Sequence, residues 1–342
     1  MGETWTQAAP GLADELAALE ELLRAEFGGE GLVRTDAAAL LLGGGKRLRP
    51  ALVIGSAMLG QYDRGQALPV AAAAEALHAA TLAHDDVIDE ADSRRGRPAL
   101  HRQRGNHIAI YTGDYLLGRA LLLLSRSGLA GQDIGRFASA IDMMCTGEVA
   151  QYLGRDRVPG YREYLRRIIG KTGVLFAACC VAGGRLGGLA DREVNRLWRF
   201  GLHLGAAFQI RDDLIDVAGD GASAGKPVGH DLIEGVVTLP VLLAAANADY
   251  RRLLGQYLGG AHTVEGAREL MALARQNGAV DDAMRRLVEQ VDRSLALLSS
   301  LPDGPGRDAL TAIVRRMTPA DSLSLVAHRR IGNDSVASCS MA

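Results

Sequence analysis

Two short acidic motifs, each embedded in an apolar segment, constrain this chain more than any other feature. Asp-Asp-Val-Ile-Asp occupies residues 85–89, and Asp-Asp-Leu-Ile-Asp occupies residues 212–216. Apolar residues precede and fill both motifs, which predicts that each belongs to a buried helix and not to a solvated loop. On a helix, the first and fifth residues of a motif share one face, and the second lies near it. Each motif should therefore project a cluster of carboxylates from an otherwise apolar wall.

Carboxylates clustered in an apolar wall need cations. Like charges repel each other, and burial removes their hydration, so an uncompensated cluster opposes folding. Oxygen ligands suit hard ions, and Mg²⁺ in particular bridges carboxylates to substrate phosphates while keeping several waters. A single motif of this kind is commonly a set of acids that cap a helix or pair with arginine. Two copies with the same spacing and filling instead predict a Mg²⁺–diphosphate site inside a helical bundle.

The few lysines lie in glycine-containing segments that suit a phosphate. Lysine and arginine together number 38, yet lysine occurs only at positions 46, 171 and 226, each directly after a glycine. Glycine lets a backbone approach a ligand closely, and lysine binds phosphate as a compact point charge. Any one of these lysines could be a helix-terminal cation or a turn residue. Together they predict anion contacts by Lys46, Lys171 and Lys226.

The rest of the chain is patterned for helices. Apolar residues make up 48% of the 342 residues and aromatic residues only 4%, so the core is rich in alanine, leucine and valine, which favours helix. No alternating strand pattern of useful length occurs. We expect one all-α domain over residues 1–327 and a frayed polar tail over 328–342. Helices are expected at 12–27, 37–42 (capped by Asp36), 51–59, 70–89, 108–124, 134–153, 161–183, 194–217, 264–277, 280–301 and 306–317.

Net charge and cysteine spacing exclude several classes of function. A formal net charge of −2 gives no reason to expect binding to nucleic acid, or to a membrane through charge. The four cysteines have neither zinc-ligand nor disulfide-scaffold spacing, so a reducing cytoplasm is the default compartment. The N-terminus lacks a basic region followed by an apolar stretch, and the apolar runs are too short or too interrupted by charge to cross a bilayer. We therefore expect a cytoplasmic protein with no transmembrane segment.

Taken in order, the motifs resemble those of the trans-isoprenyl diphosphate synthases, also called polyprenyl synthetases. The resemblance covers about residues 12–318 and does not rest on one motif, since terpene cyclases also carry a single aspartate motif. It consists of Gly-Lys-Arg-Leu-Arg-Pro at 45–50, His78 with the first acidic motif, Arg-Arg-Gly at 94–96, Gly147-Glu148 with Gln151, Lys171-Thr172, Phe-Gln-Ile-Arg-Asp-Asp at 208–213, and Gly-Lys-Pro-Val-Gly at 225–229.

The resemblance implies a role for each matching residue. The metal ligands that it implies are Asp85, Asp89 and Asp212, with Asp86, Asp213 and Asp216 as further ligands or supports of three Mg²⁺ ions. The diphosphate of an allylic substrate would be held by Arg94, Lys171, Thr172, Gln209 and Lys226. Isopentenyl diphosphate would be held by Gly45, Lys46, Arg49, His78 and Arg95. Read alone, His78 is typical of a core histidine, and Gln209 of a residue bonded to its neighbours.

The implied fold is a single large helical bundle of the isoprenoid synthase type with a central apolar cavity. The implied reaction joins isopentenyl diphosphate to an allylic diphosphate and yields an all-trans polyprenyl diphosphate. Metals and cations stabilise the charge that builds on the departing diphosphate. The isopentenyl double bond attacks the allylic cation, and the released diphosphate is the base that removes a proton. Apolar helix walls keep water from quenching the cation.

One position departs from the family pattern. The family commonly shows Gly-Lys-x-Thr before Leu-Pro, whereas this chain has Val236 at the lysine position. One cation near the allylic diphosphate is therefore missing, and the candidates to replace it are Arg211, Arg329 and Arg330. Two other functions are disfavoured. A terpene cyclase needs no isopentenyl site, so Lys46, Arg49 and Arg95 disfavour it. A non-catalytic regulatory subunit should have lost an acidic motif, and both motifs are intact.

The helix before Asp85 predicts a long product. The small residues Ala80 and Thr81 lie five and four positions before Asp85. One or two helical turns before them, the sequence has no aromatic residue. In short-chain members of the family a bulky residue near this position, or an insertion in the motif, closes the pocket. We expect products beyond about twenty carbons, with a geranylgeranyl-length product as the alternative. The resemblance also implies a homodimer, with residues 108–124 as the candidate interface.

Overall fold

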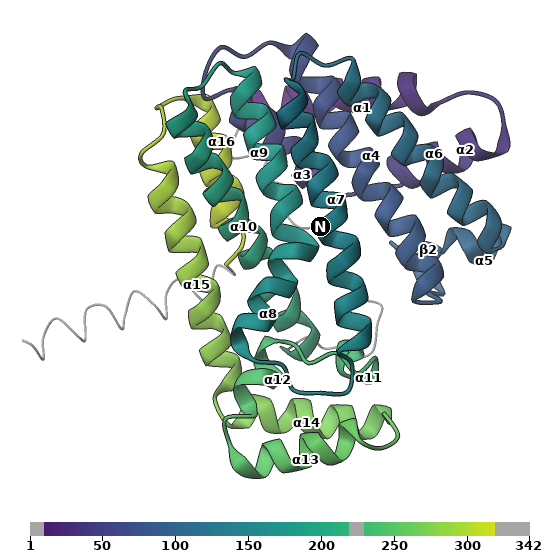
Figure 1. The fold of residues 1–342 in the computed structure, drawn as a ribbon, viewed down its shortest axis with the longest axis vertical. Coiled ribbons are helices and arrows are strands. Elements are labelled where there is room, and N and C mark those ends of the chain that lie inside the picture. The colour runs from purple at the N-terminus through teal and green to yellow at the C-terminus, as the bar shows by residue number, and fades with distance from the viewer. Residues whose placement is uncertain (1–9, 219–228, 319–342) are drawn as a thin grey trace, which may run out of the picture.

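The protein is built almost entirely of α-helices in the computed structural model, which describes residues 10–218 and 229–318 (Figure 1). The predicted all-α fold is confirmed. The strands found in these two ranges are β1 (Ser93–Arg94) and β2 (Arg97–Pro98), which pair as a short antiparallel hairpin. Lys226 and the tail predicted at 328–342 lie outside the described residues, so the division at residue 327 stays a prediction.

The helices follow one another along the chain with short connections. They are α1 (Pro10–Phe27), α2 (Leu32–Leu42), α3 (Leu48–Ala57), α4 (Arg64–Ile88), α5 (Leu100–Arg104), α6 (Asn106–Ser125), α7 (Gly131–Leu153), α8 (Tyr161–Ile168), the π-helix η2 (Ile169–Gly173), α9 (Val174–Leu186), α10 (Asp191–Ala218), α11 (His230–Ile233), α12 (Leu239–Ala244), α13 (Ala248–Leu258), α14 (Val264–Gln276), α15 (Ala279–Leu298) and α16 (Pro305–Arg315).

The long helices pack side by side, with α9 between α3 and α10 (Figure 1). Residues 174–184 of α9 are all buried. Small residues let its neighbours approach closely: a Cβ atom added at Gly183 would lie 2.1 Å from the carbonyl oxygen of Val53, and one at Gly201 would lie 2.4 Å from the Cα atom of Ala177. Because the helices approach so closely, a core with few aromatic residues is still filled.

α4 presents the first acidic motif at its C-terminal end. The side chain of Asp63 caps its start by accepting a hydrogen bond from the Gly65 N–H at 2.8 Å. The helix therefore begins at Arg64, before the predicted start at residue 70, and contains Pro69. α6 packs along α4. Among the described residues, α6 is long and apolar enough to cross a membrane; 39% of its apolar stretch is buried inside the protein.

A second, smaller apolar core lies at the bottom of the view in Figure 1. It is formed by residues of α11, α12, α13 and α14. Its members include Val217 at the end of α10 and Val237 before α12. This core therefore fixes the end of α10, just after the second acidic motif, and the loop that contains Val236.

η2 interrupts what the sequence analysis expected to be one helix over residues 161–183. A π-helical turn is an α-helix with one extra residue inserted, and such turns are frequent at functional sites. Lys171 and Thr172 both lie in it.

The capping prediction at Asp36 is wrong, and the helices α5, α11, α12 and α13 were not predicted. Asp36 does not cap a helix, because α2 begins at Leu32 after Gly31, which places Asp36 inside the helix. The buried carboxylate of Asp36 instead lies 3.5 Å from the guanidinium of Arg104, so a tertiary ion pair takes the place of the predicted capping interaction. The apolar pattern also failed to predict α13, whose start is set by the Asn247 side chain, an acceptor for two backbone N–H groups.

Candidate active site

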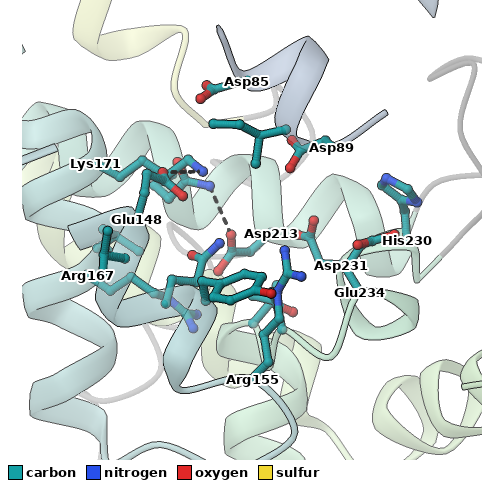
Figure 2. A pocket seen from close by; sticks show the side chains of 18 of the residues that line it. Asp85, Asp89, Glu148, Arg155, Arg167, Lys171, Asp213, His230, Asp231 and Glu234 are labelled. Atoms are coloured by element: carbon teal, nitrogen blue, oxygen red, sulfur yellow. Dashed lines mark hydrogen bonds and ion pairs between the residues drawn. The ribbon is translucent and has the colours of Figure 1, made fainter. Parts of the chain in front are cut away.

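Both acidic motifs face one cavity at the C-terminal ends of α4 and α10 (Figure 2). The cavity has a volume of about 390 Å³, and we refer to it as the acidic cavity. The carboxylates that line it are those of Asp85, Asp89, Glu148, Asp213, Asp231 and Glu234, and its cations are Arg155, Arg167 and Lys171. Acids from four separate segments thus converge, as the paired motifs predicted.

The pKa values of four aspartates of the two motifs are raised, although Asp212 and Asp216 do not themselves line the acidic cavity. Burial raises the pKa of Asp85 to about 6 and that of Asp213 to about 6. Burial together with the like charge of Asp213 raises the pKa of Asp212 to about 7, and burial with the charge of Asp231 raises that of Asp216 to about 7. The Asp212 side chain is itself open to solvent, so its shift reflects the protein that surrounds it. Ionised, these groups need a cation.

The donor set fits Mg²⁺ that is shared with a bound diphosphate. The Oδ2 atom of Asp216 is buried without a hydrogen-bond partner. Within residues 10–218 and 229–318, no three acidic, histidine or cysteine side chains converge into a complete metal cage. Mg²⁺ commonly binds one or two carboxylates and completes its shell with water and substrate phosphates. Asp85 on α4 and Asp89 at its C-cap, with Asp212 and Asp216 on α10, suit that arrangement.

Protein groups hold the second aspartate of each motif. The buried carboxylate of Asp213 accepts hydrogen bonds from three donors: the Tyr164 hydroxyl (2.8 Å), the Leu239 N–H (3.1 Å) and the Gln209 amide (3.2 Å). Asp86 is 2% exposed and pairs with Arg94, and both line a separate pocket beside the β1–β2 hairpin. These contacts make Asp86, Asp213 and Arg94 positioning residues in this structure, and their implied contacts with metal or diphosphate stay predictions.

Lys171 projects from η2 into the acidic cavity (Figure 2). Its Nζ atom lies 2.6 Å from Oε1 of Glu148 on α7. Burial acts to lower the pKa of Lys171, but the Glu148 carboxylate outweighs it and holds the pKa above its usual value. Beside it, the Thr172 hydroxyl donates to the Gln209 side-chain oxygen at 3.2 Å. A polar chain thus connects η2 to the second acidic motif through Gln209.

A second cavity, of about 520 Å³, opens at the start of α3, and we refer to it as the basic cavity. Its lining includes all five residues implied to bind isopentenyl diphosphate: Gly45, Lys46, Arg49, His78 and Arg95. The guanidinium of Arg49 lies over the Phe176 ring at 5.2 Å, and its Nε atom is buried without a hydrogen-bond partner. Burial, with the nearby charges of Arg49 and Arg95, holds the pKa of His78 well below its usual value, so the imidazole is neutral near pH 7.

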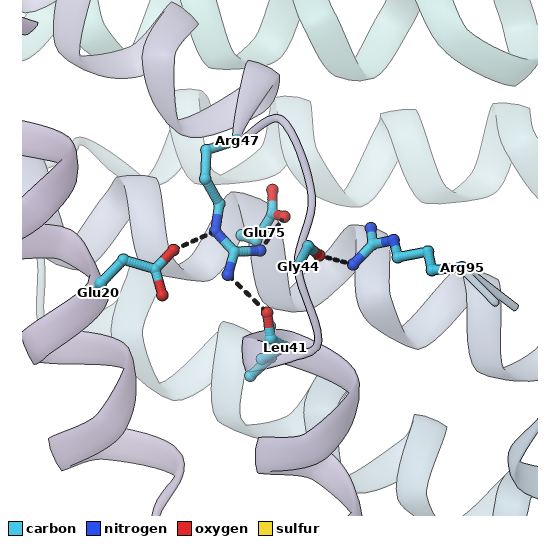
Figure 3. A network of polar contacts seen from close by, with 6 residues as sticks. All are labelled: Glu20, Leu41, Gly44, Arg47, Glu75 and Arg95. Atoms are coloured by element: carbon cyan, nitrogen blue, oxygen red, sulfur yellow. Dashed lines mark hydrogen bonds and ion pairs between the residues drawn. The ribbon is translucent and has the colours of Figure 1, made fainter. Parts of the chain in front are cut away.

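Arg47 holds the glycine-rich loop that forms the wall of the basic cavity (Figure 3). It has a left-handed backbone, with φ of 49°, at the residue before α3. Its buried guanidinium donates to three acceptors: Glu20 (2.5 Å), Glu75 (2.9 Å) and the Leu41 carbonyl (2.7 Å). Arg95 donates to the Gly44 carbonyl from the opposite side. The sequence motif contained Arg47 without indicating this anchoring role.

Comparison with known proteins places the chain in a family. The family model for polyprenyl synthetase matches residues 32–273. The chain belongs to the polyprenyl synthetase family. The resemblance on which the sequence analysis relied is therefore confirmed, and with it the prediction of a trans-prenyltransferase.

The similar proteins cover nearly the whole of this polyprenyl synthetase. Heptaprenyl diphosphate synthase component 2 of Geobacillus stearothermophilus is 39% identical over 303 residues, which are 87% of this chain and 93% of the relative. Nonaprenyl diphosphate synthase of Mycobacterium tuberculosis is 38% identical over 304 residues, or 87% and 90% of the two chains. The crystal structure of heptaprenyl diphosphate synthase from Staphylococcus aureus superposes with a TM-score of 0.85 at 31% identity, covering 90% of this chain and 97% of that one.

The two residues predicted to set product length lie on α4 of this synthetase. Ala80 is 3% exposed and belongs to the main apolar core. Thr81 is half-buried, and its hydroxyl donates to the His78 carbonyl at 2.9 Å. Neither residue lines the acidic cavity or the basic cavity. Their role therefore stays a prediction.

Val236 lines the acidic cavity, where the family pattern has a lysine. Arg211, a candidate to replace that cation, is not among the residues that line the cavity, and Arg329 and Arg330 lie outside the described residues. Arg155 and Arg167 do line it, and sequence reasoning missed both. Neither belongs to a recognisable motif, so only the folded arrangement brings them to the acids.

Proposed function

We propose that this synthetase condenses isopentenyl diphosphate with an allylic diphosphate to make a medium- or long-chain all-trans polyprenyl diphosphate. The observation that carries the proposal is the presence of two differently charged cavities, the acidic one with Asp85 and the basic one with Lys46 and Arg49. The acidic cavity suits a diphosphate held through Mg²⁺, and the basic cavity suits one held by protein cations. Relatives named heptaprenyl, nonaprenyl and octaprenyl diphosphate synthase support this choice.

In this reaction the protein binds, orients and shields the two substrates. Lys171 and Gln209 contact the allylic diphosphate, while Arg49 and Lys46 hold isopentenyl diphosphate. When bound by the aspartates, Mg²⁺ supplies stabilisation of the negative charge on the leaving diphosphate. The contacts of Asp213 with α8 and α12 keep the second motif in place before substrate arrives, which limits reorganisation during the reaction. The apolar helices exclude water from the reacting carbons.

An incubation with isopentenyl diphosphate, farnesyl diphosphate and Mg²⁺ tests the proposal. We expect diphosphates longer than the primer, no product after chelation with EDTA, and recovery on adding Mg²⁺. A terpene cyclase would instead convert the primer to a hydrocarbon or alcohol without using isopentenyl diphosphate. A regulatory subunit would bind without turnover. Either of these results would replace the proposed function.

Removing a cation from the basic cavity should affect one substrate selectively. Arg49→Ala and Arg95→Ala each remove a guanidinium from the cavity that does not contain the acidic motifs. We expect KM for isopentenyl diphosphate to rise about tenfold or more, as loss of a charge-assisted hydrogen bond predicts, with a small change in KM for the allylic primer. Arg102→Ala is the control, because Arg102 is exposed and pairs with Asp92. Equal effects on both KM values would contradict the assignment.

We propose that the chain forms a homodimer through α6, which contains the candidate interface at residues 108–124. The outer face of α6 is apolar, with Ile110 (40% exposed), Tyr111 (59%) and Leu121 (45%), which a partner could cover. Leu123 and Leu124 are buried in the protein's own core, so only part of the candidate interface at residues 108–124 is available to a partner. One relative is named as component 2 of a heptaprenyl diphosphate synthase, so the alternative to a homodimer is a complex with a different protein.

Light scattering of the purified chain at micromolar concentration should give twice the mass of one chain. The mass of a single chain would exclude the homodimer.

We also propose the cytoplasm as the compartment. The cysteines among the described residues, Cys145, Cys179 and Cys180, are free thiols, and the last two are buried. Unpaired thiols persist in a reducing compartment. Fractionation of the native host's cells should recover the protein in the fraction free of membranes.

A further inference from the structure

We infer that Arg155 binds the allylic diphosphate and supplies the positive charge that Val236 lacks. The inference deepens the proposed function and rests on it, because it assigns a further substrate-binding residue to the same acidic cavity. No motif of the sequence contains Arg155.

Arg155 and Val236 belong to two loops that are joined to each other at the cavity wall. Both residues line the acidic cavity. The N–H of Asp156, in the loop after α7, donates to the Gly235 carbonyl at 3.0 Å. A Cβ atom built on Gly235 would lie 3.4 Å from the Cβ atom of Arg155. A side chain at position 155 therefore starts beside the position where the family has its lysine.

The Arg155 side chain extends into the cavity toward the acids of the second motif. Figure 2 shows it rising from the loop into the space beside Asp213 and Asp231. The guanidinium stacks on the Tyr152 ring at 4.9 Å, which holds it in place without neutralising its charge. Tyr152 lines the same cavity, so the charge and its support are both at the site.

The other cations of the cavity already have partners. Lys171 forms an ion pair with Glu148 at 2.6 Å, and Arg167 donates to the Val237 carbonyl at 2.7 Å. By contrast, the Nε atom of Arg155 is buried without a hydrogen-bond partner, and no described residue forms an ion pair with its guanidinium. A buried donor without an acceptor is unfavourable, and a diphosphate in the cavity would provide one. The planar guanidinium also matches two phosphate oxygens at once, which a lysine ammonium does not.

The test measures binding of farnesyl diphosphate with Mg²⁺ by titration calorimetry, in the absence of isopentenyl diphosphate so that no turnover occurs. Arg155→Met removes the charge and keeps an apolar stem against Tyr152. We expect its Kd to rise about tenfold or more, the loss expected for a charged hydrogen bond. Arg155→Lys keeps the charge and should lose much less. KM for isopentenyl diphosphate should stay within about twofold of wild type, since that substrate is assigned to the basic cavity.

The decisive variant is the double substitution of Arg155→Met with Val236→Lys. It moves the cation from one loop to its hydrogen-bonded neighbour, so we expect Kd to return close to the wild-type value. Arg157→Met is the matched control, because Arg157 lies in the same loop but is exposed and pairs with Glu163. Thermal melting of every variant identifies those that are merely unfolded.

Three results would overturn the inference. They are wild-type affinity in Arg155→Met, a loss in Arg155→Lys as large as in Arg155→Met, and a double variant as weak as Arg155→Met alone. Failure of the proposed function is a separate result. In that case the wild type makes no longer product, while the calorimetric comparison of the variants still reports whether Arg155 contacts a diphosphate.

Discussion

Replacing Asp85 or Asp212 with alanine is expected to lower kcat by about a thousandfold, which corresponds to ~4 kcal/mol of lost transition-state stabilisation. Each substitution removes one carboxylate from the set that fits Mg²⁺, and the leaving diphosphate is then less well compensated. The two residues come from different helices, α4 and α10, so similar losses in both would show that the motifs act on one reaction centre. Steady-state kinetics at saturating Mg²⁺ measure the effect.

Thermal melting without Mg²⁺ separates this result from unfolding. The protein that surrounds Asp212 and the like charge of Asp213 oppose ionisation of Asp212, so removing its carboxylate should leave Tm unchanged or raise it. Asp92→Ala is the matched control, because Asp92 is 91% exposed and lies outside the acidic cavity. Activity within about tenfold of wild type in Asp85→Ala would mean that Asp85 is not a metal ligand.

Ala80→Phe should shorten the product. The growing chain is expected to run along α4 away from the acids, and Ala80 is a buried residue more than one helical turn before Asp85. A phenylalanine there fills space that the later isoprene units would occupy. Chromatography of dephosphorylated products should show a shift from chains beyond about twenty carbons to shorter ones.

A graded series makes this prediction specific. Ala76→Phe places the same ring about 6 Å further from the acids, because a helix rises 1.5 Å per residue. Its product should therefore be intermediate in length. Overpacking commonly costs about 1–3 kcal/mol, so each variant's Tm is needed beside its product profile. Unchanged products in both folded variants, or a wild-type product of only fifteen carbons, would contradict the proposed path.

The fold class could be predicted because helical apolar spacing and a small-residue core recur along most of the chain. Element boundaries were less accessible, since single polar residues decide them. Asp63 starts α4 before Pro69, whereas Asp36, which has the same chemistry, pairs with Arg104 inside α2. The two carboxylates differ in their tertiary partners, and a sequence does not state those partners. The capping residue Asn247 was overlooked although its hydrogen bonds are local, to the N–H groups of Asp249 and Tyr250.

The acidic motifs and the basic loop could be located from sequence because their chemistry is concentrated in short segments. Contacts between segments far apart in the chain could not be predicted from sequence. Arg47 is held by Glu20 and Glu75, each more than twenty-five positions away, and neither acid looks functional in isolation. Arg155 lines the acidic cavity from a loop that is hydrogen-bonded to the loop at Gly235, eighty positions away. Spacing along the chain carries no signal for such an arrangement.

The extra residue in η2 sets the angle by which the side chains of α8 are rotated about the helix axis relative to those of α9. α9 is fixed by close packing with α3 and α10, so its orientation cannot change. Each α-helical residue turns the chain by roughly 100°. A chain one residue shorter between Ile168 and Val174 could keep both helices intact and still carry Tyr164 away from Asp213, whose carboxylate it now binds. The number of residues in η2 therefore sets the alignment of Tyr164 with Asp213, apart from the contacts that Lys171 and Thr172 make, and a single deletion there should break the Tyr164–Asp213 hydrogen bond.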